Sequence, residues 1–132
     1  MIATIQAAIS GHATATTIHA ETVPLTMQRV ASLLPPAQLK DAMTSCAQAL
    51  RLVINQRLVP STNGKWTPLR EFLVCDAGYR RRLAGTKADD WPQITAEAIE
   101  KDGQSYAEAI ALALAQARID EETAEAVRRE IG

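Results

Sequence analysis

The sequence predicts an α/β fold in which one β-hairpin is combined with a series of short helices. Three observations lead to this prediction. Apolar residues recur at helical spacing over most of the chain, and two strand-like runs flank an Asn63-Gly64 pair. Aromatic residues make up only 4% of the sequence, so alanine, leucine and isoleucine supply most of the apolar side chains. We therefore expect an aliphatic core that is mostly helical.

The length and charge of the chain limit its possible functions. With 132 residues it can bury a hydrophobic core without stabilising cross-links. Its formal net charge of -1 gives no broad positive surface for nucleic acid. The longest apolar run, AIALALAQA, is shorter than the roughly 20 residues that cross a bilayer, and the N-terminus lacks a signal-peptide pattern. We predict a soluble chain with no direct nucleic-acid binding and no transmembrane segment.

The first twenty residues predict a helix followed by a strand. Ile2, Ile5 and Ile9 form a helical stripe, and Gly11 follows as a natural helix stop. The stretch HATATTIHA, residues 12–20, alternates and is rich in threonine, which favours a strand. The first helix has no N-cap and no preceding turn, so we expect the sequence to start inside a larger fold.

Two helices are predicted for residues 22–34 and 36–50. Thr22 is a suitable N-cap for the first, with Pro24 in its first turn, and the pair Pro35-Pro36 separates the two helices. The predicted apolar faces are Leu25, Val30, Leu33 and Leu34 in the first helix, and Leu39, Met43, Cys46, Ala47 and Leu50 in the second.

The middle of the chain predicts a β-hairpin, because the runs RLVINQRLV and WTPLREFLV flank the Asn63-Gly64 turn. Helices are expected to follow it, with stops at Gly85 and Gly103, and the last two, within residues 105–131, should form a helical hairpin. The charged stretch GTKADDWP, residues 85–92, is the predicted boundary. It divides the chain into a domain of residues 1–84 and a helical domain of residues 85–132.

The two histidines of the chain, His12 and His19, lie seven residues apart in the predicted first strand. An odd separation on an unbroken strand sends their side chains to opposite faces, so no metal site is predicted. Two interpretations stay open. They are ordinary polar histidines, or one of them makes a phosphate or catalytic contact at the end of the strand, where open α/β sheets place ligand-contacting groups.

Other candidate motifs have simpler explanations. Gly64-Lys65 does not end a phosphate-binding loop, because Val59 stands where that motif requires glycine. The run Arg80 to Arg82 is read as a solvated or subunit-contacting face. Cys46 and Cys75 form no CxxC pair and are read as reduced, buried residues of a cytosolic protein, with a disulfide as the alternative.

Several stretches together resemble the secretion ATPase superfamily, the PilT-like hexameric motors of type IV pili and of type II and type IV secretion. TIQAAISGHATATTIHA resembles the His box of that family, with His12 and His19 at its two histidines. MQRVASLLP resembles the helix that follows the box. The hairpin sequence, including VINQRLVP and REFLV, resembles the segment that leads into the C-terminal helical domain.

The resemblance implies the C-terminal half of a RecA-like nucleotide-binding core, followed by a small helical domain. His19 falls where the family has the histidine that senses the γ-phosphate, so it is the expected catalytic and nucleotide-contacting residue. His12 is the second expected nucleotide-site residue and is read mainly as structural. The phosphate-binding loop and the Walker B acids are expected before Met1, so ATP and Mg are expected cofactors of the full-length protein only.

The resemblance also implies partners and a place in the cell. The full-length protein is expected to be a homo-hexamer, cytoplasmic and peripheral at the bacterial inner membrane, where it meets the secretion or pilus machinery. GYRRRLAG departs from the signature of pilus-retraction motors, whereas NQRLVPSTNGKWTPLREFLV is closer to the conjugation and type IVB secretion branch. The alternative is a stand-alone, non-enzymatic binding module that docks on such a motor.

Overall fold

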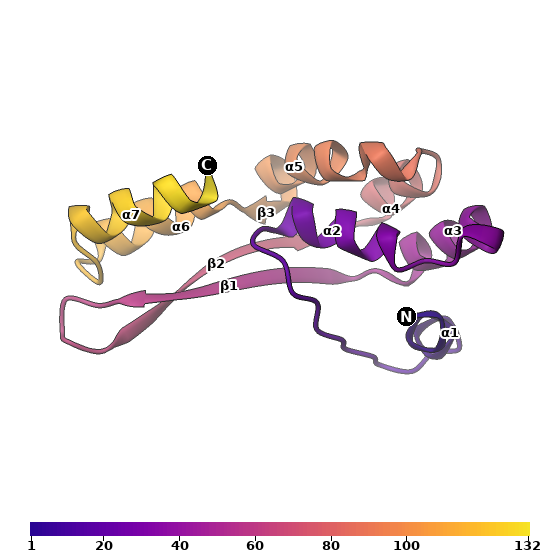
Figure 1. The fold of residues 1–132 in the computed structure, drawn as a ribbon, viewed down its shortest axis with the longest axis horizontal. Coiled ribbons are helices and arrows are strands. Elements are labelled where there is room, and N and C mark those ends of the chain that lie inside the picture. Colours follow the sequence, from indigo (N-terminus) through magenta and orange to yellow (C-terminus); the bar gives the residue numbers. More distant parts are fainter.

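The computed structural model describes every residue from Met1 to Gly132 and combines helices with a three-stranded sheet. Figure 1 shows the arrangement of its elements. None of the helices is both long and apolar enough to span a membrane. The elements, in chain order, are α1 (Ile2–Ile9), α2 (Val23–Ser32), the short 3-10 helix Pro36–Gln38, α3 (Leu39–Ala49), β1 (Leu52–Pro60), β2 (Trp66–Val74), α4 (Ala77–Ala84), the 3-10 helix Ala88–Asp90, α5 (Trp91–Asp102), β3 (Gly103–Gln104), α6 (Tyr106–Ala115) and α7 (Glu121–Ile131).

The predicted hairpin is confirmed. β1 and β2 pair in antiparallel fashion from Leu52 opposite Val74 to Pro60 opposite Trp66, and β3 adds to the other edge of β2. In the turn, Gly64 has a φ of +79°, a conformation that favours glycine. Each of these two strands has nine residues.

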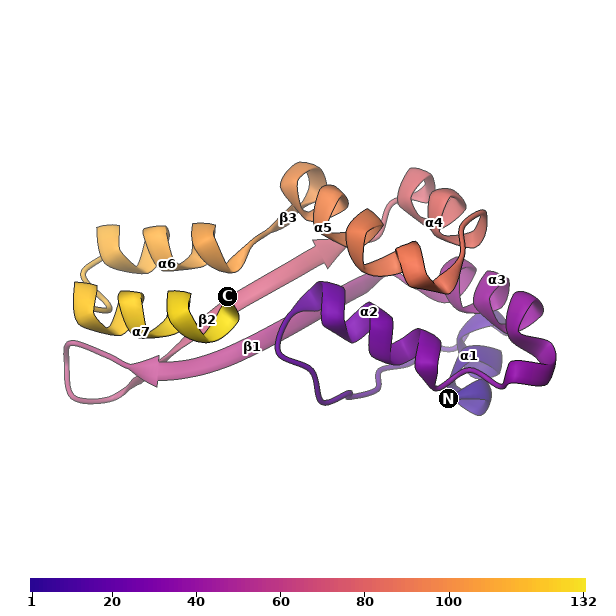
Figure 2. The ribbon, with the colours of Figure 1, turned by 45° about the horizontal axis from the view of Figure 1, so that its top comes forward.

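Helices α2, α5, α6 and α7 cover one face of the hairpin. In Figures 1 and 2, α2 and α5 lie over one half of the hairpin, and α6 and α7 lie side by side over the other half. The covered face carries the odd-numbered residues of both strands, of which Val53, Val59, Leu69 and Leu73 are buried. This alternation follows from the two-residue period of a strand. The opposite face exposes five large apolar residues, Leu52, Ile54, Leu58, Trp66 and Val74.

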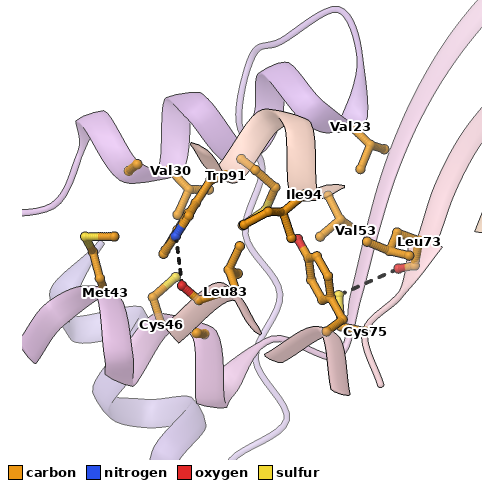
Figure 3. Close-up of a cluster of buried hydrophobic side chains, with 14 of the residues drawn as sticks. Val23, Val30, Met43, Cys46, Val53, Leu73, Cys75, Leu83, Trp91 and Ile94 are labelled. Carbon is orange, nitrogen blue, oxygen red and sulfur yellow. Dashed lines mark hydrogen bonds between the residues drawn. The ribbon is translucent and has the colours of Figure 1, made fainter. Parts of the chain in front are cut away.

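The buried apolar residues form two clusters. The larger one includes residues of all five helices from α1 through α5 and of one end of the hairpin. Figure 3 shows Trp91 beside Val30, with its indole N–H donating to the Leu83 carbonyl at 3.0 Å. The smaller one joins α6 and α7 to the other end of the hairpin through Val59 and Leu69. The packing therefore changes cluster between α5 and α6, while the boundary at residues 84 and 85 stays a prediction.

The helix ends follow the predicted capping chemistry. Thr22 caps α2 by accepting from the Leu25 amide at 3.3 Å, and the turn at Gly85 ends α4 as expected. The face predicted for the helix at residues 22–34 is wrong in part, because Leu25 and Leu33 are exposed whereas Val30 and Leu34 are buried. α2 turns Val23 and Met27 inward instead, toward the larger cluster.

Both cysteines are buried free thiols, which agrees with the predicted reduced state. Burial raises the pKa of Cys46 to about 11, and burial also raises the pKa of Cys75 to about 11. A thiol with such a pKa stays protonated at neutral pH and behaves as a small apolar side chain.

The predicted strand at residues 12–20 is wrong. This stretch has no regular secondary structure, and Figure 1 shows it as an extended connection between α1 and α2. A strand is stabilised by backbone hydrogen bonds to a neighbouring strand, and none of the three strands of this sheet pairs with these residues. The alternating threonine pattern is therefore present, but no neighbouring strand is hydrogen-bonded to it.

Candidate functional site

His19 lies on the wall of a groove between the connection to α2, helix α2 itself and strand β1. The groove has a volume of about 430 Å³, and Met27, Val30 and Val53 supply part of its apolar lining. The His19 side chain is exposed. The polar part of the lining comes from Thr16, Thr17, His19, Thr26, Asn55 and Gln56. These side chains offer hydroxyl, imidazole and amide donors to an oxygen-rich ligand, but no lysine or arginine.

His12 belongs to a different environment, the C-terminal end of α1. Its ring atom Nδ1 lies 3.1 Å from the Ser10 hydroxyl, and its backbone amide donates to the Ala7 carbonyl at 3.1 Å. Gly11, with a φ of +95°, forms the turn between them. His12 does not line the groove that His19 lines, so the structure brings only one of the two predicted site residues to it.

Two polar side chains that sequence reasoning missed hold the residues that follow His19, Ala20 and Val23. Asn55 of β1 and Glu71 of β2 are opposite each other in the strand register, on the covered face of the hairpin. The Asn55 side-chain amide donates to the Ala20 carbonyl at 2.7 Å, and Glu71 accepts from the Val23 amide at 2.6 Å. A signal was available in the sequence, because both residues occupy inward positions in runs whose other inward residues are mostly apolar.

The Asn55–Glu71 pair also reaches the start of α6. The hydroxyl group of Tyr106 donates to the Asn55 side-chain oxygen, and Tyr106 itself is almost fully buried. The guanidinium carbon of Arg57 lies over the ring of Tyr106, 5.9 Å from the ring centroid. Arg57 also forms an ion pair with Glu130 of α7. One cross-strand pair therefore contacts both the His19 connection and the C-terminal helices.

Glu71 is a buried carboxylate whose environment disfavours its charge. Burial raises the pKa of Glu71 above its ordinary value, and hydrogen bonds from the Val23 and Tyr106 backbone amides partly oppose this rise. A raised pKa in the folded state means that the folded protein binds the proton more readily than the unfolded chain. The stabilising contribution of Glu71 is therefore complete below the unfolded pKa and is lost as the pH rises through the folded pKa.

We expect the variant Glu71→Gln, which has no titrating group at this position, to show this pH dependence of stability. The free energy of unfolding of the wild type, minus that of Glu71→Gln, should fall as the pH rises above about 4.5, the ordinary glutamate value. Urea denaturation between pH 4 and pH 8 measures this difference. An equal pH trend for Glu100→Gln, at an exposed position of α5, would contradict the explanation.

The arginine run lies on α4, away from the His19 groove. Arg80 is half-buried and donates to the Cys75 carbonyl at 2.7 Å, whereas Arg82 is exposed and ion-paired with Glu97 of α5. Arg81 is also exposed and, with Arg80, lines a smaller hollow beside Gln48. These contacts explain one arginine as structural and leave the other two on the surface.

Comparison with known proteins decides the family. The model of the family described as "Type II/IV secretion system protein" matches residues 1–130. The chain belongs to this family. The predicted resemblance to the secretion ATPase superfamily is thus confirmed. No curated protein matches the chain.

Solved structures with a similar fold cover nearly the whole of this chain. The ATPase DotB of Legionella pneumophila has a TM-score of 0.89 and 25% identity, over 96% of this chain and 34% of that one. The ATPase DotB of Yersinia pseudotuberculosis has a TM-score of 0.85 and 20% identity, over 93% and 32%. The pilus retraction motor PilT with bound ADP has a TM-score of 0.79 and 21% identity, over 96% and 35%.

These likenesses confirm the predicted fold class, a mixed helix and strand fold that matches the C-terminal portion of DotB and PilT. The 25% identity with the DotB of Legionella pneumophila supports the DotB-like branch. The chain spans about a third of the length of the structures that it matches. The activities of those whole proteins, and the roles predicted for His12 and His19, therefore remain predictions for this chain.

Proposed function

We propose that this chain works as the C-terminal part of a hexameric motor ATPase that couples ATP hydrolysis to type IV secretion, conjugative transfer or pilus dynamics. The observation that carries the proposal is the likeness of 96% of the chain to an ATPase, DotB, at a TM-score of 0.89. The motor would be cytoplasmic and peripheral at the inner membrane, with the secretion or pilus machinery as its partner.

The residues of the groove fit one part of a nucleotide site. A triphosphate carries several negative charges, and its binding normally requires a glycine-rich loop with a lysine. The groove beside His19 holds neutral donors and no cationic side chain, so it suits a contact to one terminal phosphate and not the whole cradle. The remaining contacts to ATP and Mg would come from a phosphate-binding loop elsewhere in the motor, and this chain alone would not hydrolyse ATP.

Within such a motor, we propose that the imidazole of His19 donates a hydrogen bond to the γ-phosphate. Its exposed position on the groove wall leaves the ring free to do so. A hydrogen bond to a charged oxygen contributes about 1.5–3 kcal/mol. The contact would be made with ATP and lost with ADP, so His19 would distinguish the two nucleotide states. His12, held at the end of α1, would keep the connection in place.

The variant His19→Ala, in a motor chain that includes a phosphate-binding loop, tests this role. We expect ATP turnover to fall roughly 10- to 150-fold, which corresponds to the loss of one charge-assisted hydrogen bond. The fold should persist, because the side chain is exposed and has no buried partner. Steady-state ATPase assays with thermal melting measure both properties. Gln28→Ala, at an exposed position of α2, serves as the control, and unchanged turnover in His19→Ala would overturn the role.

A further inference from the structure

The Asn55–Glu71 pair connects two parts of the molecule that are far apart in the sequence. Asn55 contacts Ala20 and Tyr106, which lie 35 and 51 residues away from it along the chain. Glu71 accepts from Val23, and the backbone amide of Tyr106 also lowers its pKa. Both members of one cross-strand pair thus face the same two elements, the junction of the His19 connection with α2 and the first residue of α6.

On the histidine side, Asn55 attaches the connection between α1 and α2 to the sheet by a hydrogen bond. From Ala13 to Ala20 the chain has no regular structure, and the hydrogen bond that joins this stretch to the sheet is the one from the Asn55 side chain to the Ala20 carbonyl. His19 is the residue directly before that carbonyl. Val23, three residues further on, is fixed by Glu71 at 2.6 Å. The orientation of His19 therefore depends on where the pair holds Ala20 and Val23.

On the other side, Tyr106 is built into the C-terminal helical hairpin. It is the first residue of α6, only 1% exposed, and it packs in the smaller cluster with Ile110 and Leu69. Arg57 covers its ring and binds Glu130 near the end of α7. A displacement of α6 and α7 relative to the sheet would consequently move the Tyr106 hydroxyl group away from Asn55.

We propose that Asn55 is a positioning residue for His19 and that Tyr106 links the α6–α7 hairpin to it, so that the position of the C-terminal helices controls the nucleotide contact. This inference rests on the proposed function, because it gives His19 the γ-phosphate contact argued above. In the opposite direction, a shift of His19 on hydrolysis would pull on Asn55 and be passed to α6 through the same two hydrogen bonds. Binding couplings of this kind act in both directions.

A double-mutant cycle in a motor chain with a phosphate-binding loop tests the link. Tyr106→Phe removes one hydroxyl group and keeps the ring in its cluster, and we expect kcat to fall roughly five-fold, with KM for ATP changed less. In a His19→Ala background the same substitution should have almost no further effect on kcat, because a residue that acts only through His19 cannot act once it is gone.

Two further variants make the result decisive. Asn55→Asp keeps the acceptor for Tyr106 but replaces the donor to Ala20 by an oxygen, so it should lower kcat at least as much as Tyr106→Phe. Tyr79→Phe is the matched control, because Tyr79 is also buried and its hydroxyl group lies 2.9 Å from Thr95, with no hydrogen bond to Asn55 or Glu71. It should leave kcat unchanged.

The outcomes separate the two proposals. If His19→Ala does not lower turnover, the proposed function of His19 fails. If His19→Ala lowers turnover but Tyr106→Phe has the same effect in both backgrounds, or Tyr79→Phe matches it, the link fails while the proposed function stands. A five-fold effect that disappears in the His19→Ala background supports the link.

Discussion

Gly103→Ala is expected to destabilise the protein by about 3 kcal/mol or more and to break the pairing of β3 with β2. A Cβ atom at this position would lie 2.2 Å from the Phe72 carbonyl oxygen and 3.2 Å from the Ile99 Cα atom. Both neighbours are backbone atoms, so they cannot turn aside as a flexible side chain would. Gly103 has a φ of -144°, an ordinary extended value, and the position therefore needs glycine for space and not for its dihedral angles.

The loss of stability in Gly103→Ala should be concentrated at the junction between α5 and α6. Gly103 pairs with Leu73 and Gln104 pairs with Phe72, and the Gln104 side chain also donates to the Arg70 carbonyl at 2.8 Å. Without this pairing, the C-terminal helices would keep their own cluster but lose their attachment to β2 at the start of α6. Urea denaturation gives the stability change, and amide hydrogen exchange of residues 103 and 104 locates it.

Gly85→Ala is the matched control for this prediction. A Cβ atom there would lie 3.5 Å from the Arg81 carbonyl oxygen, an ordinary contact distance, and the φ of Gly85 is -87°. Its free energy of unfolding should change by less than about 1 kcal/mol. If the two variants are equally stable, or if hydrogen exchange at residue 104 is unchanged in Gly103→Ala, the close packing of β3 is not what requires glycine.

The elements that the sequence predicts well are those defined by neighbouring residues. Asn63-Gly64 sets the hairpin because its conformation is a property of the turn itself. Thr22 caps α2 because its hydroxyl group needs only the amide of Leu25, three residues along the chain. Such local signals do not depend on the rest of the fold, and the structure confirms them.

The predictions that fail or fall short depend on distant contacts. The threonine-rich stretch at residues 12–20 has a strand pattern, but a strand also needs a partner, and no ladder forms here. Leu25 and Leu33 fit a helical stripe, yet the neighbours that decide which side of α2 is buried come from α5 and the hairpin. The helical period predicts which residues share one side of a helix, but it does not predict which side faces the core.

The candidate site shows the same division. His19 was identifiable from its motif, whereas the pair that holds its segment was not, because Asn55 and Glu71 meet only when β1 and β2 pair in this register. Their contact with Tyr106 requires in addition that α6 start beside β2. The sequence shows that Asn55 and Glu71 are polar residues at inward strand positions, which predicts a buried hydrogen-bond network. It does not show which residues they bond to.

Trp91→Ala is expected to lower the free energy of unfolding by about 3–5 kcal/mol. The side chain has no exposed surface and lies at the start of α5, where the larger cluster joins α2, α4 and the hairpin (Figure 3). Its indole N–H donates to the Leu83 carbonyl at 3.0 Å. Truncation would leave a cavity and also remove the shortest hydrogen bond to that carbonyl, which then keeps only the longer contacts from Thr86 at 3.4 Å, so the transfer and hydrogen-bond losses add.

The second tryptophan of the chain supplies the control. Trp66 is 68% exposed on the open face of the hairpin, and Trp66→Ala should change the free energy of unfolding by no more than about 0.5 kcal/mol. In that variant all indole fluorescence comes from Trp91, so the emission of the folded protein should be that of a buried ring and should move to longer wavelength on denaturation. Equal stability losses in the two variants, or an emission typical of a solvated ring in Trp66→Ala, would place Trp91 outside the core and contradict the packing of α5 on the hairpin.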